Sequence, residues 1–281
     1  MLLIFVSGFI YSQNAPTPEM VRQMIAGDIK SLNIEPEKVL KIENQTIENI
    51  PIRIYYPNVA TKANIIYNIH GGALIAGDLD THDNISRKIA NATNSVVVAI
   101  DYKKAPENPF PQSLNDVFSI YGWMLKNKAK LSGKKSSISI VADSGGALFA
   151  AALQIQIKQK NVEKIKKIVY INPAFDLRNP GEGIYGLVTK WYLNGADPNN
   201  ELASPILTKD FSVFAPSLIV VNEKDVLLPQ GIEFSEKLTS ANVKNEIVKI
   251  PGEDHFGGFW SAGHPKVNFA FEKSIAFLKS N

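Results

Sequence analysis

The 281-residue chain contains no cysteine. This absence excludes a thiol nucleophile, a thiolate metal site and disulfide bonds. Histidine is also scarce, and the four histidines show none of the spacings typical of metal ligands, such as H-E-x-x-H. They are His70, His82, His255 and His264. We therefore expect no metal site, and any catalytic nucleophile must be something other than a thiolate.

The chain has no large excess of charge of either sign. Its 30 Lys and Arg residues face 27 Asp and Glu residues, which leaves a net charge of +3 without a dense basic block. A nucleic-acid partner is not expected from such a pattern. With 45% hydrophobic and 20% charged residues, the composition is typical of one large globular domain that needs no disulfide bond or metal ion for stability.

The sequence also lacks a hydrophobic run long enough to span a bilayer. Residues 2–10 are almost wholly apolar, and the polar stretch 11–14 follows them. This pattern is typical of a secretory signal peptide, although a hydrophobic helix packed on the domain would also fit. We predict a signal peptide over residues 1–13, a single domain over 14–281, and a periplasmic or secreted protein. Without cleavage and export the protein would be cytoplasmic.

Short apolar segments alternate with amphipathic ones along most of the chain. Strands are predicted at 38–42, 52–56, 64–69, 95–101, 137–141, 167–171, 217–221 and 245–250, with a turn at 49–51. Helices are predicted at 16–32, 83–92, 113–127, 146–159, 230–240 and 265–279. This alternation predicts an α/β fold, with a mostly parallel sheet covered by helices on both faces. Ligands bind such sheets at the carboxyl ends of the strands.

One long irregular stretch interrupts this alternation. Residues 173–207 are rich in glycine and contain a single helical segment at 185–193. A long insertion at the carboxyl end of the sheet is typical of a lid or a substrate wall.

Ser144 lies where a predicted strand runs into a predicted helix, in the sequence S-I-V-A-D-S-G-G-A-L. A tight turn there requires small residues two positions before and two positions after the serine, and these are Ala142 and Gly146. Such a nucleophile elbow exposes the serine hydroxyl at a helix N-terminus. Taken alone, the segment could equally be a serine that caps a helix at a glycine-rich turn.

A serine nucleophile needs a base, and the base needs an acceptor. His255 follows the last strand on a glycine-containing loop, so it is the preferred base over His264. Asp225 follows the strand at 217–221 and is the preferred acid, with Glu223 as the alternative. Asp254 adjoins the base and should point away from it, while His82 is expected to cap a helix. The order serine, acid, histidine is that of α/β-hydrolases.

A glycine pair follows the strand at 64–69, in the sequence His70-Gly71-Gly72-Ala73. The backbone N–H groups of Gly71 and Gly72 could converge, together with that of Gly145, on the oxyanion of a tetrahedral intermediate. His70, Ala73 and Asp143 are expected to support this loop. Alternatively, the two glycines form an ordinary tight turn.

Together these motifs resemble the hormone-sensitive-lipase-like family of α/β-hydrolases, which includes bacterial carboxylesterases and acetyl esterases. The resemblance is carried by segments 70–73, 77–82, 101–107, 142–146, 203–205 and 224–228. It implies an eight-stranded hydrolase core with a small cap built from residues 16–32 and 174–204. It also implies that Ser144, Asp225 and His255 form a triad, that no cofactor is needed, and that ester hydrolysis proceeds through an acyl-enzyme.

The chain departs from the family pattern at several positions. Ala73 replaces the usual third glycine, which with Leu74 favours a short acyl group such as acetyl. The insertion is shorter than usual, so we expect an open cleft that admits a small-molecule or carbohydrate ester. A homodimer is compatible with the resemblance, although no residue specifies one. The alternatives are a non-catalytic binding protein on this fold and a peptidase of the same fold.

Overall fold

The computed structural model describes residues 16–31, 35–59, 64–255 and 265–280. The predicted signal peptide at 1–13 lies outside these residues, as does His264. No helix in the described ranges is long and apolar enough to cross a membrane.

Eight strands form one sheet in the order β1-β2-β4-β3-β5-β6-β7-β8. The strands are β1 (Lys41–Ile47), β2 (Ile50–Tyr56), β3 (Ile65–Ile69), β4 (Val96–Ile100), β5 (Ile138–Asp143), β6 (Ile168–Ile171), β7 (Ser217–Asn222) and β8 (Asn245–Ile250). The pairs β1–β2 and β2–β4 are antiparallel, and every other pair is parallel. This confirms the predicted eight-stranded, mostly parallel sheet.

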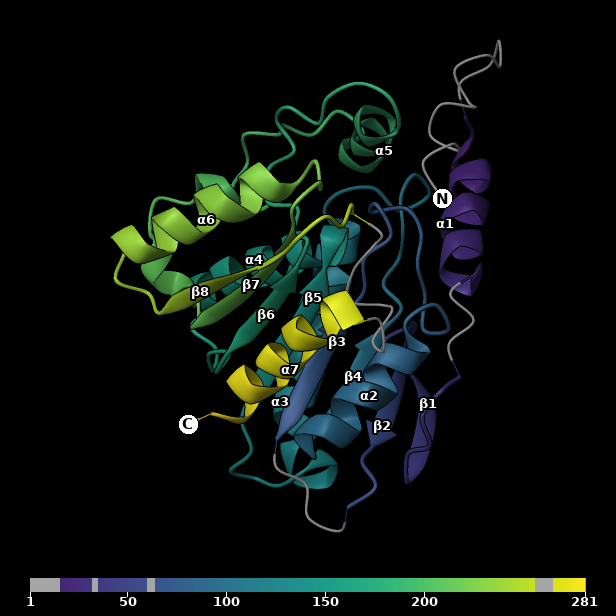
Figure 1. Cartoon of the computed structure of the whole chain (residues 1–281), viewed down its shortest axis with the longest axis vertical. Coiled ribbons are helices and arrows are strands. Elements are labelled where there is room, and N and C mark those ends of the chain that lie inside the picture. Colours follow the sequence, from purple (N-terminus) through teal and green to yellow (C-terminus); the bar gives the residue numbers. More distant parts are fainter. Residues whose placement is uncertain (1–15, 32–34, 60–63, 256–264, 281) are drawn as a thin grey trace.

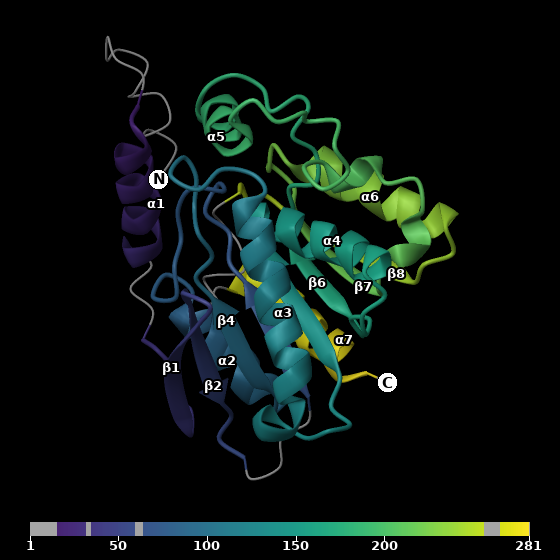
Figure 2. The same cartoon turned by 180° about the vertical axis from the view of Figure 1, so that it is seen from behind.

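Helices cover both faces of this sheet. On one face lie α2 (Asp83–Thr93) and α7 (Pro265–Lys279), and on the other lie α3 (Gln112–Leu131), α4 (Ser144–Gln159) and α6 (Leu228–Ser240) (Figures 1 and 2). Alternate strand residues feed two buried cores: Ile66 and Val97 face α2, whereas Tyr67 and Val98 join the core beneath α3 and α4. Because both faces are buried, the central strands are continuously apolar.

The first hairpin differs from the prediction. The strand expected at 38–42 begins at Lys41 and continues to Ile47, and the turn consists of Glu48 and Asn49, with φ of 52° and 62°. Two consecutive positive φ angles match the two-residue turn whose twist suits a hairpin. The strand was misplaced because the sequence of β1 is mostly polar and half exposed, as befits an edge strand, so no apolar run marks it.

Two helices lie near the carboxyl ends of the parallel strands, α1 (Pro18–Ser31) and α5 (Ile184–Leu193) (Figure 1). Thr17 Oγ1 accepts from the backbone N–H of Met20 (3.3 Å), as expected of an N-cap. The Arg22 guanidinium fastens α1 to the body through the carbonyls of Ile75 and Ala105, each at 2.9 Å. Two short 3₁₀ helices, η2 (Pro205–Leu207) and η3 (Phe211–Val213), precede β7.

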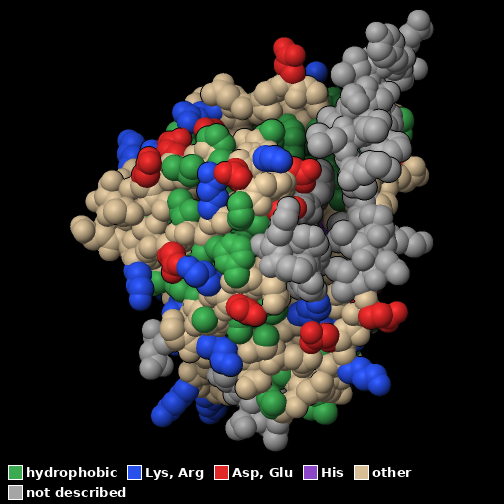
Figure 3. All heavy atoms as spheres, in the orientation of Figure 1, with side chains coloured by type: hydrophobic (Ala, Val, Ile, Leu, Met, Phe, Trp, Pro, Cys, Tyr) green, Lys and Arg blue, Asp and Glu red, His purple; other side chains and the backbone are tan. Residues whose placement is uncertain are grey.

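Basic and acidic side chains are interspersed over the described part of the face shown in Figure 3.

Candidate active site

The strand β5 runs directly into α4, and Ser144 is the first residue of that helix. Its φ is 47°, a conformation that non-glycine residues rarely adopt and that is typical of strained functional turns. Position 146 has room only for glycine, because a Cβ there would lie 2.3 Å from the carbonyl oxygen of Ile69 and 2.4 Å from that of His70. The elbow expected from the sequence is therefore present, and it presses α4 against the end of β3.

The elbow brings Ser144 to the predicted base and acid. Ser144 Oγ lies 2.9 Å from His255 Nε2, and His255 Nδ1 lies 2.8 Å from Asp225 Oδ2. The Asp225 carboxylate is buried, and its other oxygen accepts from the N–H of Leu227 (2.9 Å). With Nδ1 donating to the carboxylate, Nε2 is left to accept the serine proton.

The alternative acid, Glu223, makes different contacts. Glu223 is about half exposed and accepts from the N–H of Gly252 (2.8 Å), on the loop after β8. Asp254 is exposed. The structure thus selects Asp225 as the carboxylate that contacts the imidazole.

The glycine loop after β3 lies directly against the elbow. A Cβ on Gly71 would be 2.2 Å from Asp143 Oδ2, and a Cβ on Gly145 would be 3.2 Å from the backbone nitrogen of Leu74. The Gly71 N–H donates to Asp143 Oδ1 (2.9 Å), so it is already used. Within the described chain, the N–H groups of Gly72, Ala73 and Gly145 have no hydrogen-bond partner.

His70 braces this loop from behind. Its ring stacks on Tyr102 with centroids 4.3 Å apart, and its Nδ1 lies 2.6 Å from the carbonyl oxygen of Gly71. The Tyr102 hydroxyl donates to the carbonyl of His70 (2.8 Å). Burial, reinforced by His82 and Lys104, holds the pKa of His70 well below its usual value, so the ring is neutral at pH 7.

The expectation that His82 caps a helix is wrong. It occupies the N-cap position of α2, but its side chain makes no capping hydrogen bond. The buried ring instead lies with Nδ1 3.0 Å from Thr81 Oγ1 and Nε2 3.4 Å from Asp143 Oδ1. The ring thus lies beside the same carboxylate that holds Gly71.

Two aromatic residues of α5 take different positions. The Tyr185 ring meets His255 edge to face, with centroids 6.4 Å apart, and burial with nearby Asp225 and Asp254 raises the pKa of Tyr185 to about 12. The sequence did not single out this residue. Tyr192, on the same helix, is fully buried against Phe149.

Asparagines at two strand ends were also missed. Asn172 follows β6 and donates to the carbonyl of His255 (3.2 Å), while Asn222 ends β7 and donates to the carbonyl of Asp254. The signal that could have found them is a polar residue directly after an apolar strand at the carboxyl edge of a parallel sheet.

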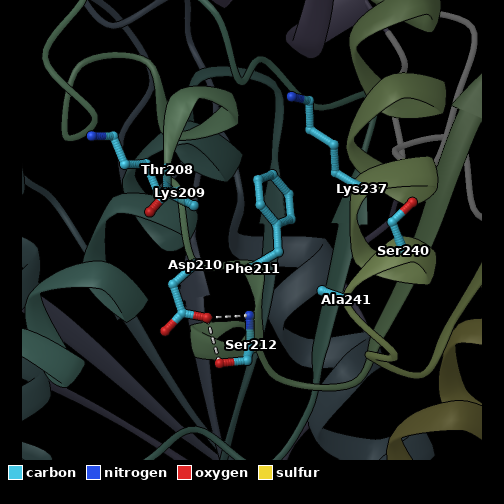
Figure 4. Close-up of a pocket in the computed structure, with 8 residues that line it drawn as sticks. All are labelled: Thr208, Lys209, Asp210, Phe211, Ser212, Lys237, Ser240 and Ala241. Carbon is cyan, nitrogen blue, oxygen red and sulfur yellow. Dashed lines mark hydrogen bonds between the residues drawn. The ribbon is translucent and has the colours of Figure 1, made fainter.

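No cluster of His, Asp and Glu in the described residues could hold a metal ion. A cavity of about 540 Å³ lies between η3 and α6, lined in part by Lys209, Phe211 and Lys237, and contains no residue of the Ser144 site (Figure 4).

A sequence model of the family described as alpha/beta hydrolase fold matches residues 66–260. The chain belongs to this family. The matched range contains the glycine loop, the elbow, Asp225 and His255. Family membership and the geometry of the sheet therefore agree.

Named esterases are similar to most of the chain. A carboxylesterase (NlhH) of Mycobacterium tuberculosis is 29% identical over 276 residues, covering 89% of this chain and 86% of the relative. An ethyl acetate hydrolase of Pseudomonas putida is 27% identical over 241 residues, covering 79% and 76%. These relatives bear out the prediction of a carboxylic ester hydrolase.

A solved esterase from the bacterial hormone-sensitive lipase family has the same fold, with a TM-score of 0.84. It is 21% identical and covers 95% of this chain and 93% of its own, a likeness that shows the fold alone. The family match and the carboxylesterase relatives confirm the predicted resemblance to α/β-hydrolases that include bacterial carboxylesterases.

Proposed function

We propose that this chain is a serine carboxylesterase that hydrolyses short-chain acyl esters, acetyl esters foremost, through an acyl-enzyme. The proposal is carried by the hydrogen-bonded series from Ser144 through His255 to Asp225, with links of 2.9 and 2.8 Å. Two such contacts in series are the signature of an activated nucleophile. The triad also sits at the carboxyl edge of the sheet, where this fold binds its ligands.

In the acylation step, Ser144 Oγ attacks the ester carbonyl carbon while its proton passes to His255 Nε2. The tetrahedral intermediate then collapses, and the His255 Nε2–H protonates the departing alkoxide, so an alcohol leaves and an ester bond to Ser144 remains. A water molecule, deprotonated by His255, attacks that ester. The bond from the acyl carbon to Ser144 Oγ then breaks, His255 Nε2–H returns the proton to Ser144 Oγ, and the carboxylic acid leaves. Asp225 holds the imidazole in the required tautomer and stabilises its charged form.

The oxyanion is held by backbone N–H groups of the glycine loop and the elbow. Gly72, Ala73 and Gly145 supply donors that no other group in the described chain occupies. Gly71, which the sequence also suggested as a donor, acts instead through Asp143, since its N–H bonds that carboxylate at 2.9 Å. Removing one such donor from an oxyanion hole typically costs about 3–4 kcal/mol of transition-state stabilisation.

The preference for a short acyl group rests on the residues beside these donors. Ala73 and Leu74 both have positive φ, 52° and 68°, and Leu74 is buried. The Leu74 Cδ2 atom lies so close to Gly145 that a Cβ there would be 2.9 Å from it. With the Leu74 side chain this close to the Gly145 N–H, the methyl group of an acetyl ester fits more readily than a long acyl chain.

The alcohol portion of the substrate would lie toward α1 and α5, which we propose form a small cap with an open cleft. Tyr185, on α5, lines this side of His255. A cap of this size would admit bulky alcohols, including sugars. Export, which rests on the predicted signal peptide at 1–13, is tested separately by N-terminal sequencing of the secreted protein.

The test is hydrolysis of p-nitrophenyl acetate, butyrate and octanoate by the wild type and by Ser144→Ala. A matched control is Ser139→Ala, which removes a buried hydroxyl from β5, the strand that leads into Ser144. We expect rates that fall from acetate to octanoate, loss of activity in Ser144→Ala, and near wild-type rates in Ser139→Ala. Full activity in Ser144→Ala would overturn the serine mechanism, and faster turnover of octanoate would overturn the acyl preference alone.

A further inference from the structure

The loop that carries His255 begins where β8 ends, at Ile250, and it is attached to the neighbouring strand end by a row of hydrogen bonds. The carbonyl of Ile250 accepts from the N–H of Glu223 (3.0 Å), and the carbonyl of Glu253 accepts from the N–H of Lys224 (2.9 Å). These two bonds join backbone to backbone. They hold the loop against the segment that also supplies Asp225.

The next two carbonyls of the loop accept from side chains. Asn222 Nδ2 donates to the carbonyl of Asp254 (2.5 Å), and Asn172 Nδ2 donates to the carbonyl of His255 (3.2 Å). The two asparagines are themselves joined, because Asn172 Oδ1 accepts from the N–H of Asn222 (2.9 Å). Both are buried, and Asn222 is fully so. The pair therefore continues the row of hydrogen bonds up to the backbone carbonyl of His255.

The same pair is tied to the nucleophile. Two residues after Asn172, the N–H of Ala174 donates to the carbonyl of Ser144 (3.1 Å). The segment after β6 thus contacts the backbone of Ser144 at one point and the backbone of His255 at another. Any movement of Asn172 would change the separation of the nucleophile and the base.

Buried polar groups are usually paired, since an unpaired one loses its hydrogen bonds to water. Asn222 Oδ1 is buried and has no partner among the described residues. A leucine or alanine at this position would avoid that cost. An asparagine at position 222 is therefore explained by its Nδ2 donor, which bonds the backbone carbonyl of Asp254, the residue before the base.

We propose that Asn172 and Asn222 are positioning residues that fix the backbone of His255, and with it the distance from Nε2 to Ser144 Oγ. This inference rests on the proposed serine mechanism. Neither side chain touches the reacting atoms, so both act through the base. A misplacement of a catalytic group by about 1 Å can cost roughly 100-fold in rate, so loss of one bond should lower kcat while substrate binding is retained.

Two substitutions remove single bonds cleanly. Asn222→Ala deletes the side-chain bond to the carbonyl of Asp254. It keeps the backbone N–H that donates to Asn172 Oδ1. Asn172 has a φ of 44°, so Asn172→Gly removes the side chain without forcing a Cβ into a left-handed conformation. Asn161→Gly is the matched control, because Asn161 has a φ of 50° but is exposed, in the turn after α4. Gln154→Ala is a second control, which deletes buried amide bonds to Tyr170 and Ala215.

The assay is hydrolysis of p-nitrophenyl acetate per folded active site, with thermal unfolding measured for each variant. We expect Asn172→Gly and Asn222→Ala each to lower kcat by about 10-fold or more with KM changed by less than about twofold, whereas both controls keep kcat within about twofold. Equal kcat in the asparagine variants and the controls would overturn the proposal, as would a loss that appears only in KM.

Ser144→Ala separates this inference from the mechanism beneath it. If Ser144→Ala is inactive and the asparagine variants match the controls, the positioning role fails and the serine mechanism stands. If Ser144→Ala remains active, the mechanism fails and the positioning role fails with it. Should Asn222→Ala not fold, Asn172→Gly, which keeps the backbone conformation, decides the question.

Discussion

Gly146 and Gly122 are both helical glycines, and the structure predicts opposite results when each becomes alanine. At Gly146, in the first turn of α4, an added Cβ would lie 2.3 Å from the carbonyl oxygen of Ile69 and 2.4 Å from that of His70. Real Cβ atoms essentially never come closer than 3.0 Å to such atoms. Because both obstacles are backbone atoms at the end of a central strand, no side-chain rotation can relieve the clash.

The cost of Gly146→Ala follows from this geometry. Overpacking a buried site typically costs about 1–3 kcal/mol of unfolding free energy, and a backbone obstacle puts this site at the upper end. The elbow and the glycine loop must also separate, which moves Ser144 away from the oxyanion donors. We therefore expect at least a roughly 100-fold loss of kcat/KM in addition to the lower stability.

Gly122 lies inside α3, and nothing comes within 4 Å of a Cβ built there. Alanine in a helix interior is favoured over glycine by about 0.5–1 kcal/mol, so Gly122→Ala should raise Tm by about 2 °C with unchanged activity. Thermal unfolding and hydrolysis of p-nitrophenyl acetate by both variants test the pair. Wild-type stability and activity in Gly146→Ala would refute the elbow as described.

Three further outcomes are expected. Burial lowers the pKa of His70 far below 6.5, so at a pH below 6.5 only the unfolded chain binds a proton at this ring. The free energy of unfolding therefore falls by about 1.4 kcal/mol for each unit by which the pH is lowered below 6.5. Urea unfolding at pH 7.5 and 5.5 should show a smaller loss of stability for His70→Gln than for the wild type, and an equal loss would contradict this. Ala73→Gly relieves a positive φ of 52° and should raise the ratio of octanoate to acetate hydrolysis; a fixed ratio would remove Ala73 from the acyl pocket. Arg22→Ala loses the bonds to Ile75 and Ala105, each worth about 1–2 kcal/mol. Limited proteolysis should therefore cut within α1 at least roughly thirtyfold faster, and equal rates would show that other contacts hold the helix.

Most of the sheet could be predicted because its central strands are buried on both faces and therefore read as short apolar runs. The edge strand β1 could not, since its sequence Lys-Ile-Glu-Asn-Gln-Thr-Ile carries only a weak alternation. Its position is set by pairing with β2 and by the positive φ angles of Glu48 and Asn49. Tertiary pairing of this kind leaves little trace in local sequence.

Ser144, Asp225 and His255 could be expected to lie close together because each follows a strand, and parallel strands place their carboxyl ends at one edge of the sheet. How each backbone donor is used could not be foreseen. The N–H of Gly71 is taken by Asp143, a contact between residues 72 positions apart that depends on the side-chain rotamer. For the same reason the inward turn of His82 became visible only in the structure.

The central claim is that Ser144 becomes covalently acylated during turnover. The most direct measurement is intact mass and peptide mapping of enzyme quenched in acid during hydrolysis of p-nitrophenyl acetate, beside Ser144→Ala. The account predicts one added acetyl group per chain, on the peptide that contains Ser144, and none in the variant. Turnover without any adduct, or an adduct on another residue that persists in Ser144→Ala, would contradict it.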